Sequence, residues 1–420
     1  MLIPLIILFI IAYIAGHLFE KLKLPALLAY MITGIGFSPY VFEFLQIKGT
    51  ASQLFITHGI ILNSAPVREL ALFIILFRAG LGLDRTGLKF HGTKAVSLSI
   101  LPCLIEAAAV GGLSVLIFNL PLIEAMIIGF VIAAVSPAVI VPQMLELQKQ
   151  QMGTDKKIPT LILAGSTIDD ILAISGFGIC IALLATDNSE DWRKMALNVP
   201  LSVASGAITG HLLAKPLTSA LKHSGMPAFL NILLLLAIAF SFKFIENSRI
   251  PFSHLIAILS LALSIQAHDY EFSETLSKWF SKLWSIAVVI LFILIGAMVN
   301  PATVVNAGLY GLLILLCGLL ARSLGVLLSL RGSTLNNRER LFCVIAYIPK
   351  ATVQATIGGI CVSLFLKGKI WLYNGLETGD LIVAMAALSI LFTAPLGALG
   401  IRIFSKKLLN TDKVNSSDIS

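Results

Sequence analysis

Residues 131–138 read VIAAVSPA, and residues 344–351 read VIAYIPKA. Each stretch lies within a long apolar segment and contains a proline, which removes a helical hydrogen bond and favours a break in the helix. The second stretch follows the first by seven predicted helices, an odd number, so the two cross a membrane in opposite directions. This arrangement predicts an inverted-topology repeat in which two broken helices meet near the middle of the bilayer.

The composition of the chain is that of a membrane protein. Its 420 residues are 57% hydrophobic and only 12% charged, and the mean hydropathy is +0.95. The apolar residues fall into blocks of roughly 17 to 25, the length that an α-helix needs to cross a hydrocarbon core about 30 Å thick. A transmembrane β-barrel would instead show short strands that alternate apolar and polar residues. Segments such as 312–320 are apolar on every side, so the spans are predicted to be helices.

Charged residues and Pro/Gly breaks divide the chain into thirteen predicted helices. They cover residues 2–19, 24–44, 66–83, 93–118, 122–147, 158–186, 196–221, 227–246, 251–267, 279–300, 303–330, 339–366 and 378–405. The predicted fold is an all-α polytopic membrane protein with about thirteen transmembrane helices, arranged as two inverted six-helix repeats with broken crossing helices. The predicted divisions are a first repeat at 1–186, a connector helix at 187–226, a second repeat at 227–407 and a polar cytoplasmic tail at 408–420.

The loop charges predict the orientation, because lysine and arginine concentrate in cytoplasmic loops. Loops on the side of the amino terminus contain seven basic residues, and loops on the other side contain nineteen. We therefore expect the amino terminus outside and the carboxyl terminus in the cytoplasm, with the protein in the inner (plasma) membrane of the cell. An even number of helices would place both termini on one side and remove this asymmetry.

Several classes of function are disfavoured by the sequence. The net charge of +8 comes from short loops between apolar segments, and no polar domain is long enough to bind nucleic acid. The five cysteines and seven histidines are scattered, without the spacing of a disulfide framework or a transition-metal site. No glycine-rich phosphate-binding loop occurs. We expect no cofactor, no nucleic-acid partner and no ATP-driven pumping.

Two adjacent aspartates lie in the middle of a predicted span. Residues 165–173 read GSTIDDILA, which places Asp169 and Asp170 roughly 100° apart on a helix. Like charges this close in a low dielectric cannot both ionise freely, so the pair can hold either a proton or a hard monovalent cation. In the alternative interpretation, neighbouring basic side chains neutralise the pair and no chemistry occurs there.

Further oxygen ligands for such a cation are predicted near the aspartates. Ser166 lies one helical turn before Asp170, and Thr167 is its neighbour. A break at Ser136 and Pro137 would free backbone carbonyls, and hard cations prefer oxygen ligands.

Four other ionisable residues lie deep in predicted spans, where an isolated charge is costly: Arg78, Glu106, Arg322 and Lys350. Arg78 is near the end of its predicted helix, so its side chain can simply extend to the membrane surface. Glu106 and Arg322 belong to equivalent helices of the proposed repeat, so we expect them to form an ion pair in the core. Such a pair can simply hold two helices together. Lys350 follows Pro349 at the second break, where a positive charge can compensate the dipoles of two half-helices.

Four motifs together resemble the sodium/hydrogen exchanger 9B type of cation-proton antiporters. They read GSTIDDILAI at 165–174, AVSPAVIVP at 134–142, RAGL at 78–81 and IPKATVQA at 348–355. The motifs occur in the order found in that family, and the resemblance extends from about residue 60 to residue 405.

The resemblance implies a thirteen-helix antiporter with a dimer domain and a mobile ion-carrying core. Such a protein is a homodimer in the lipid bilayer and exchanges Na+ or Li+ for H+ by alternating access. In that family the adjacent aspartates bind the ion, which carries over to Asp169 and Asp170. The Ser-Pro break carries over to Ser136 and Pro137.

The resemblance leaves the stoichiometry open. Electrogenic relatives have a lysine on the helix where this chain has Arg322. A guanidinium stays protonated throughout a transport cycle, so we expect one H+ per cation, released from the aspartate pair.

Three alternatives remain for the sequence. K+ in place of Na+ is the main one, because side-chain types do not fix the size of an ion site. An intramembrane aspartyl hydrolase needs two aspartates from different helices, whereas Asp169 and Asp170 are adjacent on one. An ion channel would repeat its charges as rings over several helices. We therefore expect a secondary transporter and not an enzyme.

Overall fold

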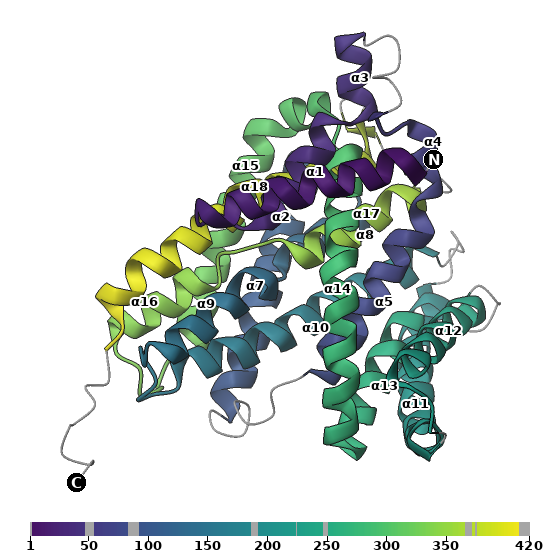
Figure 1. Cartoon of the computed structure of the whole chain (residues 1–420). Helices are drawn as coiled ribbons and strands as arrows, with labels where there is room; N and C mark the ends of the chain where they lie inside the picture. Colours follow the sequence, from purple (N-terminus) through teal and green to yellow (C-terminus); the bar gives the residue numbers. More distant parts are fainter. Residues whose placement is uncertain are drawn as a thin grey trace.

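The computed structural model describes residues 2–46, 54–82, 92–185, 192–223, 225–246, 251–365, 372–373 and 376–410 (Figure 1). In these ranges the chain is helical apart from turns and one small hairpin. The last ten residues of the predicted polar tail lie outside the described residues.

The amino-terminal half contains α1 (Leu2–Lys21), α2 (Ala26–Gly36), α3 (Pro39–Leu45), α4 (His58–Asn63), α5 (Ala65–Leu81), α7 (Thr93–Phe118), α8 (Leu122–Ala133), α9 (Pro137–Lys149) and α10 (Ile158–Ala185). The carboxyl-terminal half contains α11 (Trp192–His223), α12 (Ala228–Glu246), α13 (His254–His268), α14 (Tyr270–Met298), α15 (Pro301–Ser329), α16 (Asn337–Ala346), α17 (Thr352–Phe365) and α18 (Thr378–Leu408). An antiparallel hairpin of β1 (Leu372–Tyr373) and β2 (Leu376–Glu377) precedes α18.

Each predicted apolar segment contains one helix or two consecutive helices. The segment at 122–147 breaks into α8 and α9, and the segment at 339–366 breaks into α16 and α17. Among the described residues, six helices are long and apolar enough to cross a membrane, or seven if the bent pair α2 and α3 is one span. Thirteen membrane crossings and the inverted repeat therefore stay predictions.

The ends of several helices follow directly from the sequence. Proline stands at the first position of α9 and of α15, where its missing N–H has no helical acceptor to lose. At the start of α16, the Asn336 side chain accepts from Glu339 N and the Glu339 carboxylate accepts from Asn336 N. This reciprocal cap satisfies two donors that the first turn leaves without partners.

Two helix boundaries differ from the predicted ones. A helix was expected over 24–44, but α2 and α3 meet at an angle of 47°, because Ser38 caps a new helix that begins at Pro39. A helix was also expected to begin near residue 279 after a surface stretch. Instead, α14 begins at Tyr270 and runs unbroken, because Asp269 accepts a hydrogen bond from Phe272 N at 3.0 Å and no proline or glycine follows until Gly296.

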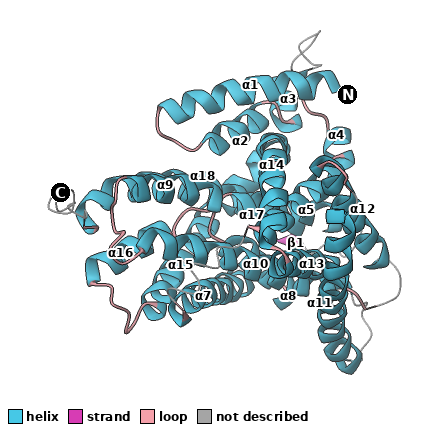
Figure 2. Cartoon of the chain, turned by 60° about the horizontal axis from the view of Figure 1, so that its bottom comes forward, coloured by secondary structure: helices cyan, strands magenta, loops and turns pink. Residues whose placement is uncertain are grey.

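The helices form two groups. One contains α1, α2, α5 and α11 to α14, and the other contains α7 to α10 and α15 to α18. Figure 2 shows α7, α9, α15, α16 and α18 on one side, α11 and α12 on the other, and α14 between them. The two groups are joined by contacts of α17 with α5 and α14, of α10 with α5, α11 and α13, and of α18 with α2 and α14. The broken helices α8–α9 and α16–α17 both belong to the second group.

The first group depends on a close crossing of α2 and α14. A Cβ atom on Gly34 would lie 2.1 Å from the carbonyl oxygen of Ile293, and one on Gly296 would lie 2.1 Å from that of Met31. The two backbones are in direct contact at this point, so neither position has room for a side chain.

Gly296→Ala is expected to destabilise the protein by about 1 to 3 kcal/mol, because the added methyl group must separate two packed backbones. Thermal unfolding of the purified protein in detergent measures the loss. Gly308→Ala on α15 is the matched control, since a Cβ there meets nothing within 4 Å. Equal stability of the two variants would show that the α2–α14 crossing is not tightly packed.

Candidate functional site

The two broken helices cross through their extended segments. The backbone N–H of Ser136, between α8 and α9, donates to the carbonyl of Pro349, between α16 and α17, at 2.8 Å. The Gln354 side chain of α17 donates to the carbonyls of Ile132 and Ala134 at 3.2 and 2.7 Å. Proline and the helix breaks leave these backbone groups without helical hydrogen bonds. Each broken helix therefore provides hydrogen-bond partners for the backbone of the other. We call this place the crossing.

Asp169 of α10 is fully buried at the crossing. Its Oδ2 accepts from the backbone N–H of Val135 at 2.8 Å, and its Oδ1 accepts from Arg322 Nη2 at 2.8 Å. Both carboxylate oxygens are therefore occupied by donors, and its charge is paired.

Arg322 of α15 is the central cation. Besides Asp169, it donates from Nη1 to Glu106 Oε2 at 2.7 Å. It also donates from Nε to the carbonyl of Tyr347 at 2.9 Å and from Nη1 to the carbonyl of Ala133. These two carbonyls lie at the carboxyl-terminal ends of α16 and α8, where a positive charge is favourable. One guanidinium thus joins two carboxylates and two half-helix ends.

Glu106 of α7 and Lys350 form the second ion pair of the crossing. Lys350 Nζ donates to Glu106 Oε2 at 2.6 Å, and both side chains are fully buried. Lys350 was predicted to compensate the half-helix dipoles. At the carboxyl-terminal ends of α8 and α16, the positive charge that does so is Arg322. Lys350 precedes the amino terminus of α17 by two residues, where a free cation would be unfavourable, so its pairing with Glu106 explains its position.

Asp170 lacks the ion pairing of the other two carboxylates at the crossing. Its side chain is 2% exposed, and Oδ1 has no hydrogen-bond partner among the described residues. Arg78 of α5 and Arg322 attract it electrostatically, but neither forms an ion pair with it in the described part of the chain. Asp170 is thus buried with a free oxygen next to a network of paired charges.

The predicted hydroxyl ligands differ in their surroundings. Ser136 is fully buried, and its Oγ has no partner among the residues that the structure describes. Ser166 is also buried, but its hydroxyl donates to the carbonyl of Leu163 at 3.0 Å and keeps only acceptor capacity. Pro137 is the first residue of α9 and Thr167 lies within α10, but their side chains fall outside the described residues.

Two residues of the crossing were not predicted. Gln354 bonds to α8 as described above, and its Oε1 has no partner within the described ranges. Tyr347 lies over Arg322, with the guanidinium carbon 5.3 Å from the ring centroid, and a Cβ on Gly165 would lie 2.1 Å from the Tyr347 hydroxyl oxygen. Gln354 stands in a stretch that the sequence singled out, since a glutamine inside an apolar helix signals a need for hydrogen bonds.

The arrangement has a simple charge balance. Glu106 and Asp169 carry two negative charges, and Arg322 and Lys350 carry two positive charges. Asp170 adds one further negative charge unless it holds a proton or a monovalent cation. No group of three or more His, Cys, Asp or Glu side chains that could hold a metal ion occurs among the described residues. One carboxylate without an ion pair among the described residues, in surroundings of oxygen atoms, suits a single monovalent cation.

Comparisons with known proteins show the family of the chain. The family model described as "Sodium/hydrogen exchanger, transmembrane" matches residues 5–407. The human sodium/hydrogen exchanger 9B2 is 34% identical over 429 residues, covering 99% of this chain and 76% of that protein. The human sodium/hydrogen exchanger 9B1 is 30% identical over 422 residues, covering 96% and 78%.

A solved structure shares the fold. The sodium proton antiporter MjNhaP1 from Methanocaldococcus jannaschii, determined at pH 8, superposes with a TM-score of 0.77. The match covers 96% of this chain and 97% of that one, at 22% sequence identity.

Glu106→Gln is expected to cost about 3 to 5 kcal/mol of stability, because it leaves Lys350 buried without a carboxylate. Adding Lys350→Met should recover more of this loss than adding Arg322→Met, since Arg322 still has Asp169 to pair with and its removal frees two carbonyls. Thermal unfolding of the single and double variants in detergent gives two double-mutant cycles, one for Glu106 with Lys350 and one for Glu106 with Arg322.

The exposed pair of Glu274 and Lys278 on α14 is the control. Glu274→Gln should change stability by well under about 1 kcal/mol. Additive losses in the Glu106–Lys350 cycle would contradict the pairing.

Proposed function

Because the chain belongs to the sodium/hydrogen exchanger family, we propose that it exchanges Na+ or Li+ for H+ at Asp170 by alternating access. The family consists of transporters rather than enzymes, and the chain is a multi-pass membrane protein that carries out cation/proton antiport. The names of its relatives support Na+ as the cation. The observation that carries the assignment to Asp170 is its buried Oδ1 without a partner, beside carboxylates that are already paired.

The charge balance of the crossing supports competition between the two substrates. With a proton or one Na+ on Asp170, the cluster of Glu106, Asp169, Arg322 and Lys350 around it stays neutral overall. With neither, a negative charge is left in low dielectric, which is unfavourable. Either ligand therefore displaces the other. In this mechanism Asp169 orients the site through Arg322 and the Val135 N–H, and it does not release a proton.

The hydroxyls of Ser136 and Ser166 are the described oxygens that we propose as further Na+ ligands, because Ser136 Oγ has no partner among the described residues and Ser166 Oγ keeps acceptor capacity. Thr167, the neighbour of Ser166 in the sequence, stays in the proposed ligand set from its position in the chain alone. Hard cations bind such oxygens at short range and tolerate backbone carbonyls among them. At the breaks beside Pro137 and Pro349, the carbonyls of Ala134 and Pro349 already accept one hydrogen bond each, so they could offer Na+ only their second lone pair.

The two helix groups suit alternating access. The second group contains the crossing, and it contacts the first mainly through α5, α11, α13 and α14. Movement of the second group past the first would carry the ion from one face of the membrane to the other. We assign the first group to the proposed homodimer contact and retain thirteen spans in two inverted repeats, with the amino terminus outside and the carboxyl terminus in the cytoplasm of a plasma membrane.

Asp170→Asn is expected to abolish Na+-dependent H+ movement, because an amide can neither release a proton nor offer a negative charge to Na+. Dequenching of a pH dye in everted vesicles, with Na+, Li+ and K+ added in turn, measures the exchange. Glu274→Gln should keep full activity. Exchange retained in a folded Asp170→Asn protein would remove Asp170 from the mechanism, and equal responses to K+ and Na+ would remove Na+ selectivity.

The transport cycle is expected to be electroneutral, with one H+ per Na+. Arg322 stays protonated, and Lys350 is held by Glu106, so one proton leaves Asp170 for each ion that binds. The measurement is Na+-driven H+ flux in proteoliposomes with the membrane potential clamped by K+ and valinomycin. An equilibrium point that moves with the imposed potential would show net charge transfer and contradict one-for-one exchange.

A further inference from the structure

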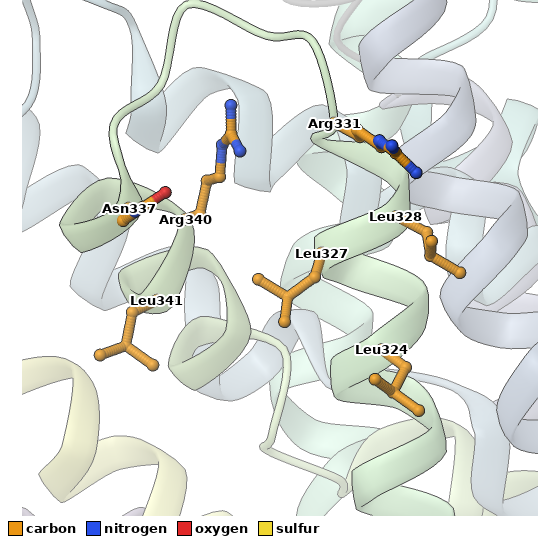
Figure 3. Close-up of a pocket in the computed structure, with 7 residues that line it drawn as sticks. All are labelled: Leu324, Leu327, Leu328, Arg331, Asn337, Arg340 and Leu341. Carbon is orange, nitrogen blue, oxygen red and sulfur yellow. The ribbon is translucent and has the colours of Figure 1, made fainter.

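A groove lies between α15 and α16, near the loop that connects these two helices and away from the crossing. Its volume is about 560 Å³. Four leucines form its walls, Leu324, Leu327 and Leu328 from α15 and Leu341 from α16. Figure 3 shows Leu327 and Leu341 on either side of the gap, with Arg331 at the end of α15 and Arg340 extending toward the connecting loop. We call it the α15–α16 groove.

The described helices leave the walls of the groove exposed. Leu324, Leu327, Leu328 and Leu341 are between 43% and 59% exposed. In a helix that crosses a bilayer, such a surface faces the acyl chains of lipids. The groove is therefore an apolar channel that opens sideways into the membrane.

The rim of the groove is positively charged. Within the described ranges, neither Arg331 nor Arg340 forms an ion pair with a carboxylate. Arg340 Nε is buried without a hydrogen-bond partner, and Arg340 Nη2 reaches the carbonyl of Ser333 only at 3.4 Å. The acidic residue of this loop, Glu339, is occupied, because both of its oxygens accept from Lys156 at 2.9 Å. In the part of the chain that the structure describes, the rim thus has no carboxylate that is free to pair with these arginines.

The amino terminus of α16 adds to the positive electrostatic potential of the two arginines. Asn337, its first residue, lines the groove, and the partial positive charge of a helix amino terminus favours an anion. The loop charges place the loop between α15 and α16 at the cytoplasmic surface, where anionic lipid head groups are found. An apolar channel that ends at two free arginines matches a molecule with an acyl chain and an anionic head.

We propose that the α15–α16 groove binds an anionic phospholipid of the cytoplasmic leaflet. Its phosphate is held by Arg340 and Arg331 and its acyl chain lies along the four leucines. The proposal depends on the orientation given above, but not on the identity of the transported ion.

Such a lipid would act close to the crossing. The two helices that line the groove are joined at its inner end by the hydrogen bond from Arg322 Nε to the Tyr347 carbonyl. Arg322 lies nine residues before Arg331, about 13 Å along α15. A lipid wedged between α15 and α16 therefore fixes the spacing of the helices that hold Arg322, and its removal should slow exchange as well as lower stability.

The test is lipid-dependent thermal stabilisation of the purified full-length protein in detergent. Dioleoylphosphatidylglycerol is titrated against dioleoylphosphatidylcholine, which has the same chains and no net charge. The wild-type protein should be stabilised more by the anionic lipid. The double variant Arg331→Gln/Arg340→Gln should raise the half-saturating concentration of phosphatidylglycerol by more than tenfold, because each arginine contributes about fivefold.

Arg338→Gln is the matched control, because Arg338 is an exposed arginine in the first turn of α16 that does not line the groove. It should change the response by less than twofold. Leu341→Trp fills the groove without altering charge and should also weaken binding, which keeps the test decisive if the double variant fails to fold.

Three results would overturn the proposal. The first is an equal loss in Arg338→Gln, which would indicate general surface attraction. The second is an equal stabilisation by phosphatidylcholine. The third is stabilisation by inorganic phosphate alone, which would assign the arginines to a free anion.

Discussion

The structure depends on a single buried guanidinium. Arg322 joins Asp169 of α10, Glu106 of α7 and the carboxyl-terminal ends of α8 and α16 in one network of hydrogen bonds. Two helices interrupted in mid-membrane would otherwise leave carbonyl groups without donors in a medium that has no water to supply them. A point charge on a flexible stem could not reach four acceptors at once, whereas the planar fork of arginine presents donors in several directions. The crossing is stable because this network neutralises both the carboxylates and the half-helix ends.

The same network defines where chemistry can occur. Each of Glu106 and Asp169 is paired with at least one cation, so adding a proton to either carboxylate would break an ion pair. Asp170 is subject to the field of these charges but has no ion pair among the described residues. Under the proposed function, protonation of Asp170 and its binding of Na+ change one charge and leave the ion pairs of Glu106 and Asp169 intact. The proposal thus gives the two adjacent aspartates different roles, with Asp169 in the stabilising network and Asp170 in the exchange.

Much of this arrangement could be predicted from the sequence, because charge is so scarce in the spans that each ionised residue stands out. That scarcity singles out the aspartate pair and the pairing candidates Glu106 and Arg322. The breaks in 131–138 and 344–351 could be predicted separately, from a proline inside each apolar segment. The partners of each charge could not be predicted, since they depend on how four helices rotate and how deep each lies. Lys350 was expected to compensate helix dipoles, and it forms an ion pair with Glu106. Gln354 and Tyr347 belong to the crossing and were not predicted there. The bend at Ser38 and the early start of α14 were missed because one capping residue decides each.

The most direct test of the account is the proton released when Na+ binds. The purified protein is placed in weakly buffered detergent solution at a pH where Asp170 is protonated, Na+ is added in steps, and a pH dye reports the protons released per ion bound. The account predicts one proton per Na+ in the wild-type protein, none in Asp170→Asn, and unchanged release in Glu274→Gln. Proton release that persists in a folded Asp170→Asn protein would contradict it.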